Sequence, residues 1–287
     1  MTAIGWQTNT TRFCINNYND IFGKSLFYGA LFLLMDEPFF EKLVHIFTVK
    51  TIVIKLSLFF SLVSCTKNNQ MVNTPVVIPI TVVTDTITRY FLALGDSYTI
   101  GQSVAEADRF PVQATKYLNQ QGFNFNAPEI IARTGWTTGN LLSSLANAAP
   151  IKPTYDIVTL LIGVNNQYQH GTQQEYADEF LILLNKAIQY AGNNKKRVIV
   201  LSIPDYSVTP FANGSDKDAI AKEIDAFNAI NKTITEKVGV NYLDITGFTR
   251  MAQTNPSLIA SDGLHPSGQE YSVWANELIP VIKTALK

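Results

Sequence analysis

From residue 89 to the end of the chain, short apolar runs alternate with longer segments whose apolar side chains recur every three or four residues. The apolar runs predict strands at 90–94, 129–132, 155–162, 198–203 and 240–243. The segments with helical spacing predict helices at 110–121, 138–149, 175–191, 216–238 and 267–286. Strands and helices that alternate through short connections form a parallel sheet with helices on both faces. We therefore expect one α/β domain at 89–287, a three-layer α/β/α, flavodoxin-like fold with a doubly wound sheet of five parallel strands.

A serine stands where this fold places its ligands. In doubly wound sheets, ligands bind beyond the carboxyl ends of the strands, and the first apolar run ends in Gly95-Asp96-Ser97. A sharp turn after the strand would lift the Ser97 hydroxyl out of the sheet toward solvent, where a base could activate it. The same residues also suit an ordinary turn in which Asp and Ser bond the local backbone. Partners for the serine decide between these two interpretations.

The histidines offer one candidate base. The chain has three, His45, His170 and His265. Asp262 precedes His265 by three residues, so one turn can bring its carboxylate to the imidazole Nδ1 and leave Nε2 for a serine, as a serine hydrolase requires. His170 has no carboxylate at a matching spacing. An Asp-x-x-His pattern is also typical of a helix cap with a surface histidine, so by itself it does not identify a base.

Candidate oxyanion donors follow two other predicted strands. Asn165 comes directly after the central strand and could donate its side-chain amide to a developing oxyanion. Gly135 follows the second strand, and without a side chain its backbone N–H can approach a substrate closely. Each has a plain alternative, an Asn-Asn turn at 165–166 and an ordinary loop glycine at 135.

Together these four blocks, in this order along residues 90–286, resemble the SGNH (GDSL) hydrolase family. The resemblance implies that Ser97 is the nucleophile and that its own N–H is the first oxyanion donor. It further implies that Gly135 N–H and the Asn165 amide complete the oxyanion hole, while His265 acts as base and Asp262 orients it. The family usually carries aspartate after the asparagine, whereas this chain has Asn166, which removes one local charge.

The expected reaction is cleavage of carboxylic esters through an acyl-enzyme, as in a lysophospholipase or short-chain esterase. A carbohydrate O-acetyl esterase, a membrane-tethered binding module without catalysis and a metallophosphoesterase are the alternatives. Two loops, 166–170 and 206–214, are expected to set specificity, because their aromatic residues suit either an acyl chain or the face of a sugar. The candidate substrate-binding residues there are Asn166, Gln167, Tyr168, His170 and Phe211.

Composition limits the partners. The net charge of −1 gives no electrostatic basis for binding nucleic acid. The two cysteines, Cys14 and Cys65, form neither a disulfide framework nor a zinc-ligand spacing. We expect no cofactor and no metal, and a monomer.

The segment before the domain carries a candidate export signal. Lys50 and Lys55 precede a short apolar core that ends at Ser64-Cys65, the arrangement of a secretory signal peptide. The ending resembles the bacterial lipoprotein box, which implies lipidation of Cys65 and an exported lipoprotein anchored in the cell envelope. We expect a signal peptide at 49–64, a tether at 65–88, and at 1–48 an extension upstream of a true start at Val49. The alternatives are a chance apolar stretch and a genuine N-terminal extension.

Overall fold

The computed structural model describes residues 86–287, which belong to the second of two compact units, Ile78–Lys287. The expected signal peptide, the candidate lipidation site Cys65 and most of the expected tether lie outside the described residues. None of the helices in 86–287 has the length and apolarity needed to cross a bilayer.

Five parallel strands form one sheet in the order β2-β1-β3-β4-β5. They are β1 (Phe91–Gly95), β2 (Glu129–Ala132), β3 (Ile157–Leu161), β4 (Val198–Leu201) and β5 (Asn241–Leu243). This is the strand order of the flavodoxin-like fold, whose switch point lies between β1 and β3. The predicted fold class is confirmed, although β3 and β4 are shorter than the apolar runs that predicted them.

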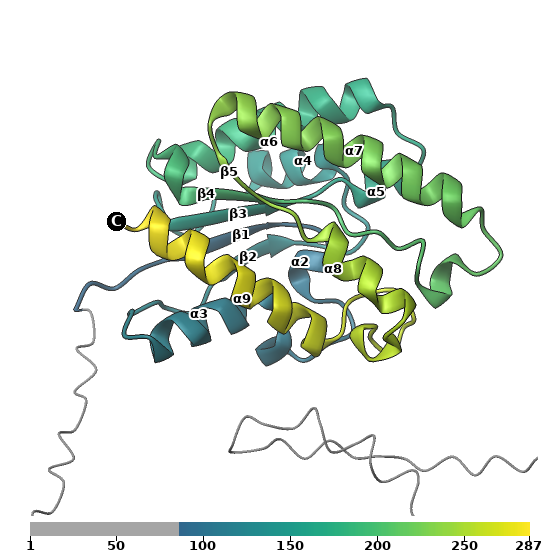
Figure 1. Cartoon of the computed structure of the whole chain (residues 1–287). Coiled ribbons are helices and arrows are strands. Elements are labelled where there is room, and N and C mark those ends of the chain that lie inside the picture. Colours follow the sequence, from purple (N-terminus) through teal and green to yellow (C-terminus); the bar gives the residue numbers. More distant parts are fainter. Residues whose placement is uncertain (1–85) are drawn as a thin grey trace, which may run out of the picture. The chain divides into compact units, whose positions relative to one another are not determined.

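Helices cover both faces of the sheet (Figure 1). On one face α3 (Phe110–Gln120) packs along α9 (Gly268–Ala285). On the other lie α4 (Thr138–Asn147), α6 (Gln173–Tyr190) and α7 (Lys217–Val238). All five were predicted, with ends that differ by one or two residues. Helix α6 starts earlier than expected because the Thr172 side chain accepts from the Glu175 N–H and caps it.

Three short helices were not predicted, because four or five residues are too few to show a helical period. They are α2 (Ser97–Ile100), α5 (Val164–Tyr168) and α8 (Thr246–Arg250). Single 3₁₀ turns add η2 (Glu106–Asp108), η3 (Lys195–Arg197), η4 (Pro210–Ala212), η5 (Met251–Gln253) and η6 (Pro256–Leu258). The expectation of a loop at 166–170 is therefore corrected: α5 contains the first part of it.

Burial follows the strand order. Every residue of β1, β3 and β4 is buried, whereas those of the edge strands β2 and β5 are half-buried.

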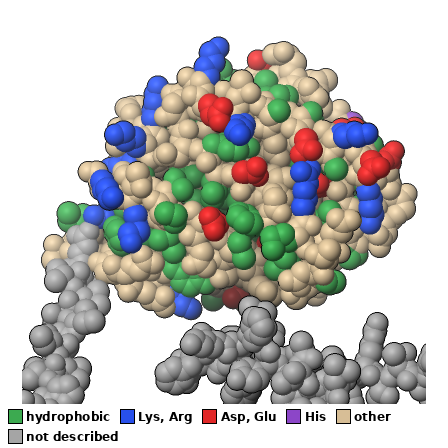
Figure 2. Space-filling model, in the orientation of Figure 1, with side chains coloured by type: hydrophobic (Ala, Val, Ile, Leu, Met, Phe, Trp, Pro, Cys, Tyr) green, Lys and Arg blue, Asp and Glu red, His purple; other side chains and the backbone are tan. Residues whose placement is uncertain are grey.

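In the view of Figure 2, Lys and Arg side chains on the left stand mostly without acidic neighbours, and on the right they mix with Asp and Glu. Lys195, Lys196 and Arg197 precede β4 and so lie at the edge where the strands begin. The carboxyl ends of the strands, where ligands bind in this fold, are at the opposite edge.

Candidate active site

The passage from β1 into α2 fixes Ser97. A Cβ on Gly95 would lie 2.1 Å from Thr99 Oγ1 and 2.4 Å from the Leu161 carbonyl oxygen, so only glycine fits there. Asp96 caps α2 by accepting the Tyr98 N–H at 3.0 Å, and Ser97 is the first residue of the helix. Ser97 is only 4% exposed. The expectation of a solvent-facing turn is thus corrected: the tight entry into α2 keeps Ser97 at the wall of a cavity.

Asp96 is a buried carboxyl group beside the serine. Burial raises its pKa to about 7, although the Tyr98 N–H and the Asn165 amide favour the charged form and act in the opposite direction. This group therefore changes charge near neutral pH, on the residue directly before Ser97.

The turn after η6 brings Asp262 to His265. Asp262 Oδ2 lies 2.6 Å from His265 Nδ1, while Oδ1 accepts the backbone N–H groups of Leu264 and His265, each at 3.0 Å. Although its burial acts the other way, hydrogen bonds from Ser103, the His265 ring and these N–H groups hold the Asp262 pKa well below its usual range. An ionised carboxylate only accepts, so Nδ1 carries the proton and Nε2 of the neutral ring is a free base.

Ser103 is a second partner of Asp262 that the sequence analysis missed. Its hydroxyl donates to Asp262 Oδ2 at 2.6 Å, across 159 residues of chain. Its backbone has a φ of 65°, an uncommon conformation for a residue other than glycine. No sequence pattern connects residues so far apart, so only the fold reveals this contact.

The two candidate oxyanion donors also face this region. Gly135 has a φ of 80°, and a Cβ there would meet no atom within 4 Å, so its backbone borders open space. Asn165 Nδ2 donates to the Trp136 carbonyl at 3.0 Å and has a long 3.5 Å contact with Asp96 Oδ2. The hydrogen on the Asp96 side is thus only weakly bound, which leaves it available to a ligand.

One cavity of about 110 Å³ joins these groups. Among the residues that line it are Ser97, Gly135, Asn165 and His265. Within residues 86–287 the Ser97 hydroxyl makes no hydrogen bond to His265; such bonds are often long in free enzymes and shorten with substrate. The arrangement has a serine, an oriented imidazole and two amide-type donors at one cavity, and these are the groups that acyl transfer requires.

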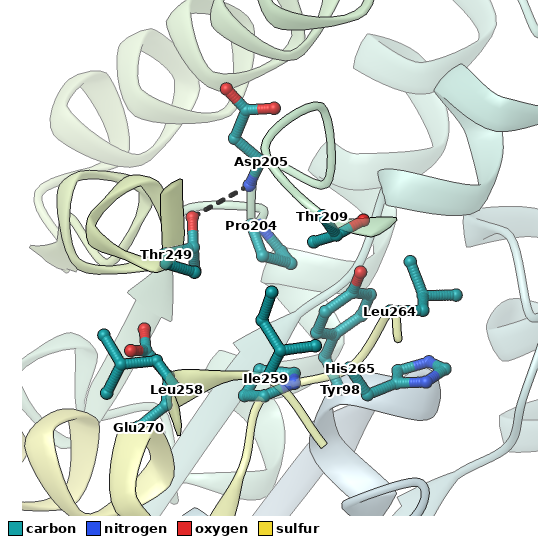
Figure 3. Close-up of a pocket in the computed structure, with 12 residues that line it drawn as sticks. Tyr98, Pro204, Asp205, Thr209, Thr249, Leu258, Ile259, Leu264, His265 and Glu270 are labelled. Carbon is teal, nitrogen blue, oxygen red and sulfur yellow. Dashed lines mark hydrogen bonds between the residues drawn. The ribbon is translucent and has the colours of Figure 1, made fainter. Parts of the chain in front are cut away.

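A smaller cavity of about 20 Å³ lies behind the His265 turn. Figure 3 shows that residues of several separate segments line it, and Tyr98, Leu264 and His265 border both cavities. The ring centroids of Tyr98 and His265 are 4.9 Å apart. Tyr98 therefore supports the imidazole from one side.

Residues 93–273 match the GDSL-like Lipase/Acylhydrolase family. The chain belongs to this family. Among solved structures it resembles a lipase/acylhydrolase from Enterococcus faecalis, with 19% identity over 69% of this chain and 97% of that one and a TM-score of 0.53. A lipolytic protein of the G-D-S-L family from Veillonella parvula shares 16% identity over 69% and 99%, with a TM-score of 0.53.

The psychrotrophic esterase EstA from Pseudoalteromonas sp., in a structure inhibited by monoethylphosphonate, shares 16% identity over 69% of this chain and 98% of that one, with a TM-score of 0.50. At such identities these structures support the fold. No curated protein sequence matches the chain. Membership of the GDSL family supports ester hydrolysis as the general activity.

The structure divides the predicted substrate-binding residues of this GDSL-family chain. Tyr168 and Phe211 line the cavity, as does Tyr206, which the sequence analysis had placed only within a loop. The other three predicted residues, Asn166, Gln167 and His170, are not part of its lining. In helix α5 the first two turn toward the protein interior and are buried, while the turn after α5 leaves His170 exposed at a φ of 57°.

Asn166, the departure from the usual aspartate of the GDSL family, joins two helices. Its Oδ1 accepts the Thr138 N–H at 3.0 Å, and its Nδ2 donates to Thr138 Oγ1 at 2.7 Å. The Thr138 hydroxyl in turn donates to Glu179 Oε2. We call this the Asn166–Thr138–Glu179 chain. It fixes the start of α4, which follows Gly135, against α5, which carries Asn165.

Proposed function

We propose that this protein is a serine esterase that cleaves carboxylic esters through an acyl-enzyme on Ser97. One observation carries the proposal. The Asp262–His265 contact of 2.6 Å assigns a proton to Nδ1, so Nε2 is the nitrogen that can accept a proton, and His265 borders the same cavity as Ser97. The base and the nucleophile thus share one ligand-sized space with the candidate oxyanion donors.

The reaction follows from this geometry. Ser97 Oγ attacks the ester carbonyl carbon while His265 Nε2 takes its proton, and Asp262 stabilises the resulting imidazolium. The tetrahedral oxyanion accepts hydrogen bonds from the N–H groups of Ser97 and Gly135 and from the Asn165 amide, each worth about 3 kcal/mol. His265 then protonates the leaving alcohol. A water molecule, deprotonated by His265, attacks the acyl-enzyme and releases the acid.

A carbohydrate O-acetyl esterase is the second candidate within this reaction class. Tyr168 and Phe211 are 51% and 46% exposed at the cavity, and exposed aromatic rings offer a face to a sugar as well as to an acyl chain. Both candidates use the same nucleophile and differ in the alcohol they release.

The Ser97→Ala variant tests the nucleophile. We expect a fluorophosphonate probe to label the wild type and not the variant, since the probe reacts with an activated serine hydroxyl. Hydrolysis of p-nitrophenyl acetate should fall by at least a thousandfold. The support for such a probe is the EstA structure, which was inhibited by a phosphonate. Labelling and activity near the wild-type level in Ser97→Ala would rule out this assignment.

The two histidines of the domain form a matched pair for the base. His265→Ala should lose activity nearly as severely as Ser97→Ala, because the serine then has no proton acceptor. His170→Ala should retain most of it, because His170 is exposed and does not line the cavity. The opposite ranking of the two variants, or equal activity of both variants and wild type, would exclude His265 as the base. No ester hydrolysis by the wild type or by either variant would instead support a binding module.

We also propose that the mature protein begins at Cys65 and is anchored through it to a membrane of the bacterial cell envelope. The support is the sequence pattern alone, in which a positive flank and a short apolar core end at Ser64-Cys65. No residue of the candidate site precedes Asp96, so the proposed anchor and the site are separate along the chain.

A further inference from the structure

Three aromatic rings form a continuous wall of the cavity that holds Ser97. The ring centroids of Tyr168 and Phe211 are 5.9 Å apart, those of Tyr168 and Tyr206 6.1 Å, and those of Tyr206 and Phe211 6.1 Å. Each ring therefore contacts the other two. They come from the end of α5, the loop after β4 and the turn η4. We call these three side chains the aromatic wall.

Local hydrogen bonds hold the two loop members of the wall in place. The Phe211 N–H donates to the Gly263 carbonyl at 3.0 Å, which ties η4 to the turn that carries His265. The Thr209 hydroxyl donates to the Tyr206 carbonyl at 2.7 Å. Phe211 and Tyr206 are thus fixed relative to the candidate base.

An ion pair between buried Asp205 and partly exposed Arg250 fixes the start of the same loop. The Asp205 side chain is 1% exposed and accepts from Arg250 Nε at 2.8 Å, and Arg250 also donates to Asp225. The Asp205 N–H donates to Thr249 Oγ1 at 3.0 Å, as the dashed line in Figure 3 shows. A loop with these attachments cannot swing outward without taking the Arg250 partner from the buried Asp205 carboxylate, so the wall is preformed.

The position of Tyr168 indicates which part of an ester meets the wall. Tyr168 follows Asn165 by three residues on α5, so both side chains lie on one face of that helix. Asn165 is the candidate donor to the carbonyl oxygen, and the carbonyl carbon bears the acyl chain. The alcohol oxygen must instead approach His265 Nε2 to receive a proton. Because Tyr168 lies on the same side as the oxyanion donor, we assign the aromatic wall to the acyl substituent. The alcohol series below tests the opposite assignment, since Phe211 is tied to the turn that carries His265.

We propose that the cavity is an acyl pocket that the aromatic wall limits to short acyl groups, from acetyl to about pentanoyl. The inference rests on the proposed esterase function and narrows its substrate class. The cavity volume is about 110 Å³, and an engineered protein cavity of about 150 Å³ binds benzene, so roughly four or five carbon atoms fit. A long fatty acyl chain would have to displace the rings or continue past them into solvent, because Tyr168 and Phe211 are half exposed at the rim. The pocket thus favours short-acyl esters over lysophospholipids.

Two ester series, measured with the purified full-length protein, test the assignment. In the first series the alcohol is p-nitrophenol and the acyl chain grows from two to twelve carbons. In the second the acyl group is acetyl and the alcohol grows from methyl to octyl. We expect kcat/KM to fall at least tenfold between the butyrate and octanoate esters of the first series, and to change less than threefold along the second.

Truncation of the wall should move this limit. In Phe211→Ala the ratio of kcat/KM for octanoate to that for acetate should rise at least fivefold, and Tyr168→Ala should do the same. Both rings are about half exposed, so their loss leaves the core intact. Ile151→Ala removes an equally apolar side chain that is 86% exposed and lies before β3, at the opposite edge of the sheet. This control should leave the ratio unchanged.

The outcomes distinguish a failure of the proposed esterase function from a failure of the acyl size limit. If no ester is hydrolysed, or if Ser97→Ala keeps its activity, the proposed function itself fails. If hydrolysis depends on Ser97 but octanoate is cleaved as well as butyrate, or if neither wall variant changes the ratio, the size limit is refuted. A cut-off that appears along the alcohol series instead would show that the pocket binds the leaving group and would overturn the acyl assignment.

Discussion

Replacing Asn166 by aspartate tests whether the Asn166–Thr138–Glu179 chain sets the junction between α4 and α5. Thr138 has one hydroxyl proton, and it goes to Glu179. The hydroxyl oxygen can accept from Asn166 Nδ2 because an amide supplies a hydrogen there. Aspartate at 166 would supply none. Two carboxylates would then compete for one proton, and one of them would lose its partner.

The expected loss of unfolding free energy can be estimated from the burial of these three residues. Asn166 is 5% exposed and Thr138 is fully buried, whereas Glu179 keeps partial contact with solvent. An unsatisfied buried acceptor costs about 1–3 kcal/mol, and more if it is charged. We therefore expect Asn166→Asp to lower the free energy of unfolding by about 3 kcal/mol at pH 8, or the Tm by about 6–12 °C for a domain of this size.

A second substitution should rescue the first. With Glu179→Gln added, aspartate at 166 accepts the Thr138 N–H and hydroxyl proton, and the glutamine amide donates to Thr138 Oγ1. Every donor then has an acceptor, so the double variant should regain most of the lost stability. Low pH should also restore stability in the single variant. Below about pH 5 one of the two carboxyl groups holds a proton and can donate it as the second hydrogen of the contact, so the loss of unfolding free energy in Asn166→Asp should become smaller.

Urea unfolding of the wild type, both single variants and the double variant, at pH 5 and pH 8, measures this coupling. Asn140→Asp is the matched control, because Asn140 is exposed at the start of α4 and uses only its Oδ1, accepting the Thr137 N–H at 3.0 Å. It should be nearly neutral. Equal stability of Asn166→Asp and wild type, or no recovery in the double variant, would refute the hydrogen-bond polarity assigned to Thr138.

Two further predictions concern Asp96 and Cys65. Because burial raises the pKa of Asp96 to about 7, the folded state binds a proton that the unfolded state releases near pH 4, and stability from this group falls as pH rises between them. The unfolding free energy of Asp96→Asn relative to wild type should therefore increase by up to about 4 kcal/mol from pH 4 to pH 8, and a constant difference in urea titrations would contradict the pKa. Native protein should fractionate with membranes and resist release by high salt, since several acyl chains anchor stably. Mass spectrometry should find an acylated N-terminus at Cys65; an unmodified chain beginning upstream of Val49 would exclude the lipidation.

The fold could be predicted because its signals are long and local. Five apolar runs and five amphipathic segments each extend over enough residues to show a period, and their alternation leaves few topologies open. The ends of β3 and β4 could not be placed, because apolar residues continue past the last paired position. Helices α2 and α5 could not be predicted because they are too short to show a helical period, although they hold Ser97 and Asn165.

Within the site, residues close in sequence were easier to predict than those that the fold brings together. Asp262 and His265 are three residues apart, so their spacing alone suggested the contact that the structure shows. Ser103, 159 residues from Asp262, had no such signal.

Two of the predicted substrate-binding residues, Asn166 and Gln167, do not line the cavity for a related reason, since a loop was assumed where α5 lies. In an extended or irregular segment, neighbours such as Asn166, Gln167 and Tyr168 could all reach one cavity. On a helix, successive residues turn by about 100°, so Tyr168 shares the face of Asn165 while Asn166 and Gln167 face the interior. The same turn that removes Asn166 from the substrate places it against Thr138. Its role in supporting the oxyanion side of the site, and the role of Tyr168 in limiting the acyl group, are therefore two consequences of one short helix.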